Sequence, residues 1–290
     1  MHTGRPTEDG LDGSEFSMGR ARGWTRKLVA AVAGVVMGAS PLGIAPAYAV
    51  VGGQEARPHQ YPFMAGLVDL RERRVMCGGA LIGDRYVLTA AHCLTGSYGS
   101  TSRVGVLLGD HDLATGSDSP NALLASPARF LTHPEYDPES QRNDIALVRL
   151  AEPVASGRDV RPVALPSAYA HGTFDHTRVE APGWGATSFG GPASDVLRTV
   201  TLGTMSNRTC ASRGMPGVTP AQLCTYAPGR DTCQYDSGGP LVHTAGRRPY
   251  LVGLVSYGRG CATETPAVNT RVWSYLTWIE RVTGIPARAA

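Results

Sequence analysis

The chain has 290 residues, of which 42% are hydrophobic, 18% charged and 7% aromatic. This apolar content excludes a disordered chain, which needs low hydrophobicity and high net charge. The net charge is +3, from 27 basic and 24 acidic residues, a balance that gives no reason to expect nucleic acid or a membrane surface as a partner. The length allows one large domain or two small ones, and no internal repeat or heptad pattern is visible.

The first 49 residues have the composition of a secretory signal peptide. A basic stretch at residues 20–27 precedes twelve apolar or small residues at 28–39, and small residues follow at Ala47 and Ala49. A charged region, a short apolar region and a small-residue cleavage site in this order are typical of such a peptide. A membrane anchor is the alternative, but twelve residues are well short of the ~20 that a spanning helix needs.

The expected start of the mature chain is Val50. Residues 1–17 are polar and acidic, which is unusual ahead of a basic region, so Met18 is the more natural first residue. Cleavage after Ala49 would expose Val50, whereas a cut after Ala47 would leave two further residues in front of it. The only lysine, Lys27, precedes both cuts, so the mature chain would contain none.

All six cysteines lie in the mature part of the chain. An even number in an exported protein predicts three disulfides. The alternative of a zinc site is disfavoured because the sequence has no C-x-x-C and no H-E-x-x-H. Six cysteines allow fifteen pairings, and their spacing does not choose one.

Short apolar runs predict an all-β fold. They recur between clusters of Gly, Pro, Asp and Ser and are rich in β-branched and aromatic residues, as expected for a β-sandwich or a β-barrel. Alternating helical patterns are absent, which disfavours an α/β fold. The predicted strands cover residues 61–68, 80–82, 86–91, 104–108, 145–150 and 251–257.

The end of the chain differs from the rest because its apolar residues have a helical spacing. That spacing predicts an amphipathic helix over 271–282, ended by Gly284 and Pro286. Residues 151–167 are rich in Pro, Ser and Arg and are predicted to link the two halves. Residues 186–195, with adjacent glycines and a proline, are predicted to form a mobile surface loop. The apolar positions that carry the helix are Val272, Tyr275, Leu276 and Ile279.

Three short segments carry residues with catalytic chemistry. They read LTAAHC, ending just after His92; NDIALVRL, which begins just before Asp144; and DTCQYDSGGP, which contains Ser237. Each has an ordinary structural interpretation on its own, as a core histidine, a capping aspartate and a turn serine. A carboxylate beside a wholly apolar strand is nevertheless costly to bury without a partner.

Together these segments resemble the chymotrypsin/trypsin family of serine peptidases, and the resemblance covers residues 50–283. The order His, Asp, Ser matches that family and differs from subtilisins and α/β-hydrolases. The resemblance implies one peptidase domain over residues 50–290, made of two antiparallel six-stranded Greek-key β-barrels with a C-terminal α-helix. The barrels would cover about 50–155 and 160–270, and the helix 271–283.

The resemblance also implies a secreted serine endopeptidase that works through an acyl-enzyme intermediate. Ser237 would be the nucleophile, and His92 would take its proton and return it to the leaving amine. Asp144 would hold the imidazole tautomer. This relay is needed because a free hydroxyl is a weak nucleophile. The backbone N–H groups of Tyr235 and Ser237 would form the oxyanion hole.

Substrate binding is assigned by the same resemblance. Asp231 would lie at the base of the specificity pocket and select Arg or Lys, because a buried carboxylate left unpaired is costly. Ser256, Tyr257 and Gly258 would pair with the substrate backbone as an added antiparallel strand.

Maturation and cross-linking follow from the resemblance as well. The α-amine of Val50 would fold inward and form an ion pair with Asp236, which would order the oxyanion hole and the pocket. The implied disulfides are Cys77–Cys93, Cys210–Cys224 and Cys233–Cys261.

Three residues depart from the family pattern. Tyr235 and Ala267 stand where glycines are usual, and Asn269 replaces an aromatic residue. A positive φ at position 235 would be resisted by tyrosine. These changes keep open a second interpretation, a catalytically weak or inactive homologue that acts as a secreted binding protein. An elastase- or chymotrypsin-like preference is a third, which Asp231 argues against.

No metal or cofactor is expected. The acidic loop at residues 110–118 overlaps the family's calcium loop, but its ligand spacing does not match. Expected partners are protein or peptide substrates and protein inhibitors, with no nucleic acid and no membrane for the mature form. The mature protein is expected to be a monomer.

Overall fold

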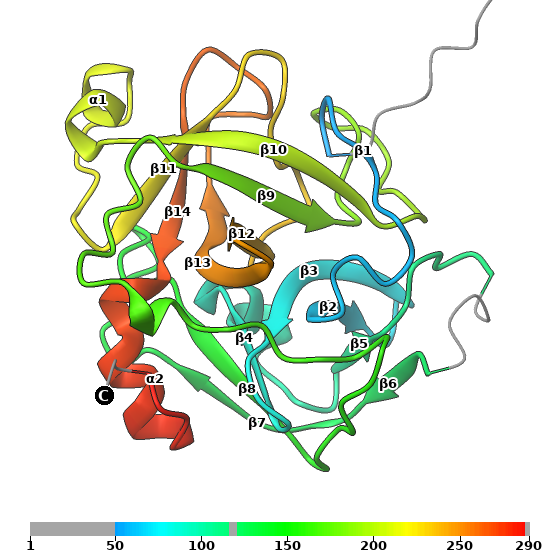
Figure 1. The fold of residues 1–290 in the computed structure, drawn as a ribbon. Coiled ribbons are helices and arrows are strands. Elements are labelled where there is room, and N and C mark those ends of the chain that lie inside the picture. Colours follow the sequence, from blue (N-terminus) through cyan, green and yellow to red (C-terminus); the bar gives the residue numbers. More distant parts are fainter. Residues whose placement is uncertain (1–49, 116–120, 288–290) are drawn as a thin grey trace, which may run out of the picture. The chain divides into compact units, whose positions relative to one another are not determined.

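The structure is a computed structural model that describes residues 50–115 and 121–287. The predicted signal peptide lies outside the described residues. All pairings between the strands are antiparallel, and the strands form two sheets (Figure 1); apart from the short strand Gln54–Glu55, the strands of the first sheet precede those of the second along the chain.

The first sheet is closed by one bent segment. Its strand order is β6-β5-β2-β3-β4-β8-β7, so β6 and β7 are its two edges. Only Ser126 separates these two strands, and they pair with β5 and β8 respectively. The segment 123–132 therefore joins both edges and acts as the sixth strand of a barrel. The strands are β2 Met64–Asp69, β3 Arg74–Leu81, β4 Tyr86–Thr89, β5 Val104–Leu108, β6 Leu123–Ala125, β7 Pro127–Thr132 and β8 Ala146–Leu150.

The second sheet closes through direct pairing. Its order is β1-β10-β11-β14-β13-β12-β9, and β9 pairs again with β10, which makes a closed barrel of six strands with β1 added at its side. The prediction of two antiparallel barrels is thus confirmed. The strands are β1 Gln54–Glu55, β9 Arg178–Gly183, β10 Arg198–Met205, β11 Gln222–Tyr226, β12 Pro240–Ala245, β13 Arg248–Tyr257 and β14 Ala267–Arg271.

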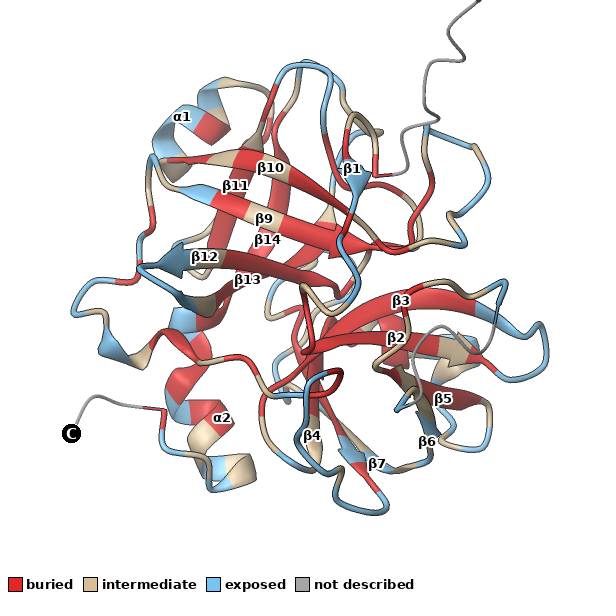
Figure 2. Ribbon diagram, turned by 45° about the vertical axis from the view of Figure 1, so that its right-hand side comes forward, coloured by how far each residue is buried: buried red, intermediate tan, exposed pale blue. Residues whose placement is uncertain are grey.

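β4 and β8 carry apolar residues at successive positions because both of their faces are buried there. Val87 on β4 faces Val148 on β8, and both lie in the core of the first barrel. The next pair, Leu88 and Leu147, lies instead in a cluster that also holds Leu254 of the second barrel. Since successive residues of a strand face opposite sides, both sides of these strands carry apolar residues here. Figure 2 shows long buried stretches along β3 and β13.

The predicted terminal helix is present but begins differently. Its first turn is a 3₁₀ turn, η4 Val272–Tyr275, followed by α2 Leu276–Thr283. Gly284 then takes a left-handed conformation with φ 73°, which ends the helix as predicted. No helix within the described ranges is long and apolar enough to cross a bilayer. The sequence did not predict α1 Asn207–Ser212; the other 3₁₀ turns are η1 Ala91–Leu94, η2 Gly96–Tyr98 and η3 Pro166–Ala168.

Candidate active site

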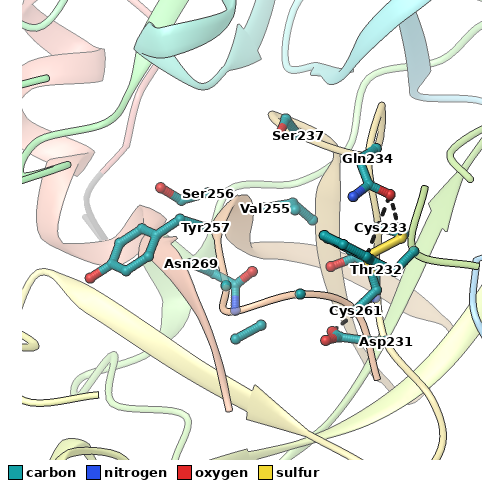
Figure 3. A pocket seen from close by; sticks show the side chains of 14 residues that line it. Asp231, Thr232, Cys233, Gln234, Ser237, Val255, Ser256, Tyr257, Cys261 and Asn269 are labelled. Atoms are coloured by element: carbon teal, nitrogen blue, oxygen red, sulfur yellow. Dashed lines mark hydrogen bonds between the residues drawn. A yellow bond between two sulfur atoms is a disulfide. The ribbon is translucent and has the colours of Figure 1, made fainter. Parts of the chain in front are cut away.

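A cavity of about 180 Å³ opens between the loop that follows β11 and the strands β13 and β14. Asp231 and Ser237 lie at opposite ends of this cavity (Figure 3). Ser256, Ala267 and Asn269 also line it. The structure therefore brings together the predicted nucleophile, the predicted specificity residue and two of the departures from the family pattern.

Asp231 is a buried anion at one end of this cavity, with a side chain 7% exposed. Its Oδ1 accepts a hydrogen bond from the N–H of Thr232 at 2.9 Å, and its Oδ2 accepts one from the N–H of Ala262 at 3.2 Å. No cationic side chain of the described chain forms an ion pair with it. Burial raises the pKa of Asp231 to about 6, against these hydrogen bonds. The cavity thus offers an unpaired carboxylate to a cationic ligand.

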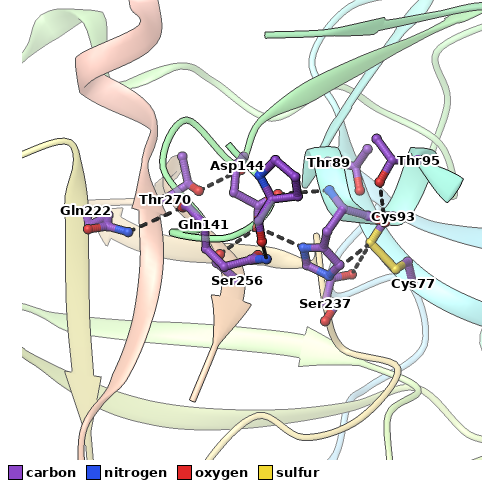
Figure 4. Close-up of polar contacts among 12 residues, drawn as sticks. Cys77, Thr89, Cys93, Thr95, Gln141, Asp144, Gln222, Ser237, Ser256 and Thr270 are labelled. Atoms are coloured by element: carbon purple, nitrogen blue, oxygen red, sulfur yellow. Dashed lines mark hydrogen bonds and ion pairs between the residues drawn. A yellow bond between two sulfur atoms is a disulfide. The ribbon is translucent and has the colours of Figure 1, made fainter. Parts of the chain in front are cut away.

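Asp144 is the centre of a second polar network, drawn in Figure 4. Its carboxylate accepts from His92 Nδ1 at 2.8 Å, from the His92 backbone N–H at 2.9 Å and from Ser256 Oγ at 2.6 Å. Asp144 is only 1% exposed, so these bonds replace its hydration. Because a carboxylate only accepts, His92 Nδ1 carries the proton, and Nε2 of the neutral ring is left as an acceptor.

His92 and the backbone of Ser237 lie against the same disulfide, Cys77–Cys93. Cys93 Sγ lies 3.7 Å from His92 Nε2 and 3.5 Å from the carbonyl oxygen of Ser237. That carbonyl accepts a hydrogen bond from the N–H of Gly78 on β3 at 2.7 Å. The histidine after β4 and the serine loop are thus fixed to the same part of the first barrel.

Gly238, directly after Ser237, has a backbone conformation and surroundings that require glycine. Its φ is 75°, a region that favours glycine. A Cβ atom at this position would lie 2.2 Å from Thr89 Oγ1 and 2.7 Å from the carbonyl oxygen of Gly78. A residue with a side chain would push the serine loop away from the first barrel.

Tyr235 adopts the conformation that is costly for its residue type. Its φ is 73°, the positive value expected for a position that is usually glycine. Its ring lies under the guanidinium of Arg74 on β3, with Cζ 5.2 Å from the ring centroid. The guanidinium is in turn paired with Glu72 at 2.5 Å. The tyrosine side chain is thus held against the first barrel.

Asp236 is a second buried carboxylate, 2% exposed. It accepts from the N–H groups of Gly185 at 2.9 Å and Cys233 at 2.8 Å, and burial raises its pKa to about 7. Val50 is fully buried in the core of the second barrel. In the uncleaved chain its nitrogen is part of a peptide bond, so the predicted ion pair between Val50 and Asp236 stays a prediction.

Three disulfides are formed, and they are the pairs that the resemblance implies. The Cα–Cα distances are 6.2, 6.2 and 5.2 Å for Cys77–Cys93, Cys210–Cys224 and Cys233–Cys261. Potential ligand atoms of Cys77, His92 and Cys93 lie within 4.8 Å of one another, but the two sulfurs are bonded to each other. This cluster therefore offers no thiolate to a metal ion.

Some contacts of the site were not predicted from the sequence. The hydrogen bond from Ser256 to Asp144 spans 112 residues, and the stacking of Arg74 on Tyr235 joins different barrels. Phe189, 68% exposed, lines the cavity from the loop at 186–195. The composition of that loop marked it as exposed, but no local signal placed it at the cavity.

Known proteins have similar sequences. A family model described as Trypsin matches residues 50–279. Venom serine protease 34 of Apis mellifera is 35% identical over 236 residues, which cover 79% of this chain but only 57% of that protein. Granzyme M of Homo sapiens is 37% identical, covering 86% of this chain and 95% of that protein. Trypsin of Phaedon cochleariae is 34% identical, covering 89% and 98%. The chain therefore belongs to the trypsin family of serine proteases.

Proposed function

We propose that the chain is a secreted endopeptidase that hydrolyses peptide bonds after Arg or Lys. The observation that carries this proposal is the unpaired, buried carboxylate of Asp231 in the cavity that also holds Ser237. A P1 cation would supply the partner that the carboxylate lacks. Phe or Ala at P1 would leave it buried and unpaired, which is costly.

The proposed chemistry uses Ser237, His92 and Asp144. Ser237 Oγ attacks the scissile carbonyl, and its proton passes to His92 Nε2, the ring nitrogen left as an acceptor. Asp144 keeps the other nitrogen protonated and stabilises the imidazolium that forms. The C–N bond then breaks, His92 gives the proton to the leaving amine, and the acyl group stays on Ser237. Water attacks this acyl-enzyme, His92 takes the proton of the water and returns it to Ser237 Oγ, and the carboxylic acid product is released. The backbone N–H groups of Tyr235 and Ser237 stabilise the oxyanion.

The substrate backbone binds along the end of β13. The register between β13 and β14 shifts between Val255 and Tyr257, so Ser256 has no partner on β14. The pairing of β13 with β12 ends before Ser256, at Leu254. Backbone groups from Ser256 to Gly258 are therefore positioned to pair with an extended peptide. The Ser256 side chain meanwhile holds Asp144, which links substrate binding to the catalytic network.

Secretion is supported by the cysteines. Three disulfides with no free cysteine in the described chain suit an oxidising compartment. A relative named a venom serine protease is in keeping with an exported protein. We propose that the partners are protein or peptide substrates and protein inhibitors, and that the protein acts as a monomer.

The test combines active-site labelling with a panel of P1 substrates. A fluorophosphonate should label the purified protein stoichiometrically, and Ser237→Ala should not be labelled. Arg substrates should be hydrolysed well above Phe or Ala substrates. Asp231→Ser should lower the Arg/Phe ratio of kcat/KM by roughly 10²–10³, because it removes the buried charge partner.

The outcomes separate the alternatives. Failure to label folded wild-type protein would favour the inactive homologue that acts as a binding protein. Normal labelling with a preference for Phe over Arg would show that the protein is a protease whose pocket has been assigned wrongly.

A further inference from the structure

Asn269 has an oxygen atom without a partner. The residue lies on β14 and is 1% exposed. Its Nδ2 donates to the carbonyl of Leu223 at 3.1 Å and to Thr225 Oγ1 at 3.0 Å. Since a carbonyl only accepts, the atom facing Leu223 must be the nitrogen, and this fixes the orientation of the amide. Its Oδ1 is buried and has no hydrogen bond in the described structure.

Asn269 is one of the residues that line the substrate cavity. Asn269 lines the cavity together with Asp231, and Figure 3 shows it across from Thr232 and Cys233. Ala267, two residues earlier on β14, lines the same cavity, as expected for alternate residues of a strand. A buried acceptor without a partner is unfavourable, so a ligand that donates to it gains a bond without displacing one.

Asp231 has acceptor capacity left for the same ligand. Each of its carboxylate oxygens takes one backbone N–H, from Thr232 and Ala262, and a carboxylate oxygen has two acceptor positions. The Thr232 hydroxyl also lies within hydrogen-bond reach of the carboxylate, so Asp231 keeps acceptor capacity for a ligand in the cavity that holds the unpaired Asn269 Oδ1. A cation with donors on several atoms matches this set of acceptors.

We infer that Asn269 is a specificity residue: its Oδ1 accepts a hydrogen bond from the guanidinium of a P1 arginine and makes Arg preferred over Lys. The inference rests on the proposed cleavage after basic residues. A guanidinium that pairs bidentately with Asp231 uses two of its five N–H groups and keeps others on a separate nitrogen. A lysine ammonium has a single nitrogen, and when it faces Asp231 it has no second nitrogen to offer to Asn269.

The direct test is Asn269→Leu, which has a similar size and no acceptor. We expect kcat/KM for a P1 Arg substrate to fall at least tenfold, because a hydrogen bond to a charged group is lost. The value for the matched P1 Lys substrate should change less than threefold. Rates are normalised to the concentration of sites that a fluorophosphonate titrates, so that misfolded protein does not contribute. Equal losses for Arg and Lys would overturn the inference.

A matched control perturbs the other end of the same amide. Thr225→Val removes one acceptor of Asn269 Nδ2 and leaves Oδ1 and the carbonyl of Leu223 in place. The Arg/Lys ratio of this variant should stay within about twofold of wild type. A ratio that falls as far as in Asn269→Leu would show that packing of β14, and not the oxygen, sets the preference.

A measurement on the unmodified protein keeps the inference testable if Asn269→Leu does not fold. An alkylguanidine and the alkylamine of equal chain length are compared as competitive inhibitors. The guanidine should bind at least tenfold more tightly, and equal inhibition would overturn the inference. If the proposed function itself is wrong, the result is different: wild-type protein shows no preference for Arg and Lys together over Phe.

Discussion

Tyr235 combines a strained backbone with a side chain held against the first barrel. Its positive φ places the ring under Arg74, on the strand that leads to Gly78, which binds the Ser237 carbonyl. We therefore expect the ring to lie on the leaving-group side of the scissile bond. A rigid Kunitz-type inhibitor extends over that side, whereas a small amide substrate does not. Tyr235→Gly should tighten the inhibitor at least tenfold and change amide hydrolysis less than threefold.

The control for this prediction is Arg74→Ala, which removes the stacking partner and leaves the backbone of Tyr235 alone. It should loosen the ring and move inhibitor affinity in the same direction by a smaller factor, with hydrolysis unchanged. If Tyr235→Gly instead improved hydrolysis and inhibitor binding equally, the tyrosine would be distorting the oxyanion hole. Loss of one oxyanion donor costs roughly 10²–10³ in rate, so such a defect would be easy to detect.

Asp231 predicts a pH dependence that is specific to charged substrates. Burial raises its pKa to about 6, so in the free protein the carboxylate gains a proton as the pH falls through about 6. Only the ionised form pairs with a P1 cation. The Arg/Phe ratio of kcat/KM should thus be constant above pH 7 and fall toward tenfold per pH unit below about 6. Using a ratio cancels the protonation of groups that serve both substrates. In Asp231→Ser the ratio should not vary with pH, and a wild-type ratio that stays constant down to pH 4.5 would contradict the assignment.

At the scale of strands and helices, strands were predicted where apolar residues form a nearly continuous run in the sequence. β4, β5 and β8 were predicted because most of their positions are buried and most of their residues are apolar. β6 and β7 were missed because most of their residues are partly exposed. β14 was missed for a different reason. It carries Asn, Thr and Arg side chains that are buried and hydrogen-bonded to backbone oxygens, and sequence periodicity treats such residues as exposed.

At the candidate site, too, residues with a local sequence signal were predicted, whereas contacts that depend on strand pairing were not. The residues proposed as catalytic and specificity residues came from short local segments; the structure places Asp231 and Ser237 at one cavity and pairs His92 with Asp144. The contacts that orient them depend on strand register. Ser256, which reaches Asp144, lies at the shift in the register between β13 and β14, and Asn269, which lines the cavity, pairs with Val255 next to that shift. A shift of that kind leaves no mark in the local sequence, so the unpaired oxygen of Asn269 became visible only in three dimensions.

At the scale of the whole molecule, Asp236 couples the start of the chain to stability. In a chain with residues before Val50, the carboxylate is buried and its pKa is raised to about 7. The folded state then binds a proton that the unfolded state releases near pH 4. This contribution to stability is fully present below about pH 4 and is lost as the pH rises through about 7. The loss is on the order of 4 kcal/mol, because the pKa of about 7 in the folded state lies about 3 above the ordinary value.

Cleavage before Val50 should remove this loss of folding stability between pH 4 and pH 7. The freed α-amine would pair with Asp236, which would lower the carboxyl pKa and raise that of the amine above its free value of about 8. The protonated amine's contribution to folding stability is present below about pH 8 and fades as the pH rises through the raised pKa of the amine. The stability advantage of residues 50–290 over residues 48–290 should therefore grow from pH 4 to pH 7 and shrink above pH 8. Urea unfolding of both forms measures this, and in Asp236→Asn the two forms should show the same pH profile.

The absence of lysine after residue 27 gives an independent test of the same ion pair. The α-amine of Val50 is then the only aliphatic primary amine of the mature protein, so an acylating reagent reports on that single group. We expect the native active protein to resist acetylation under conditions that modify the urea-unfolded chain once, because the amine is buried and held protonated by Asp236. Slow acetylation of native protein should abolish activity in proportion, since the modified amine no longer pairs. N-terminal sequencing identifies the first residue of the active form. Rapid labelling of native protein without loss of activity, or a fully active form that begins elsewhere than Val50, would refute the ion pair.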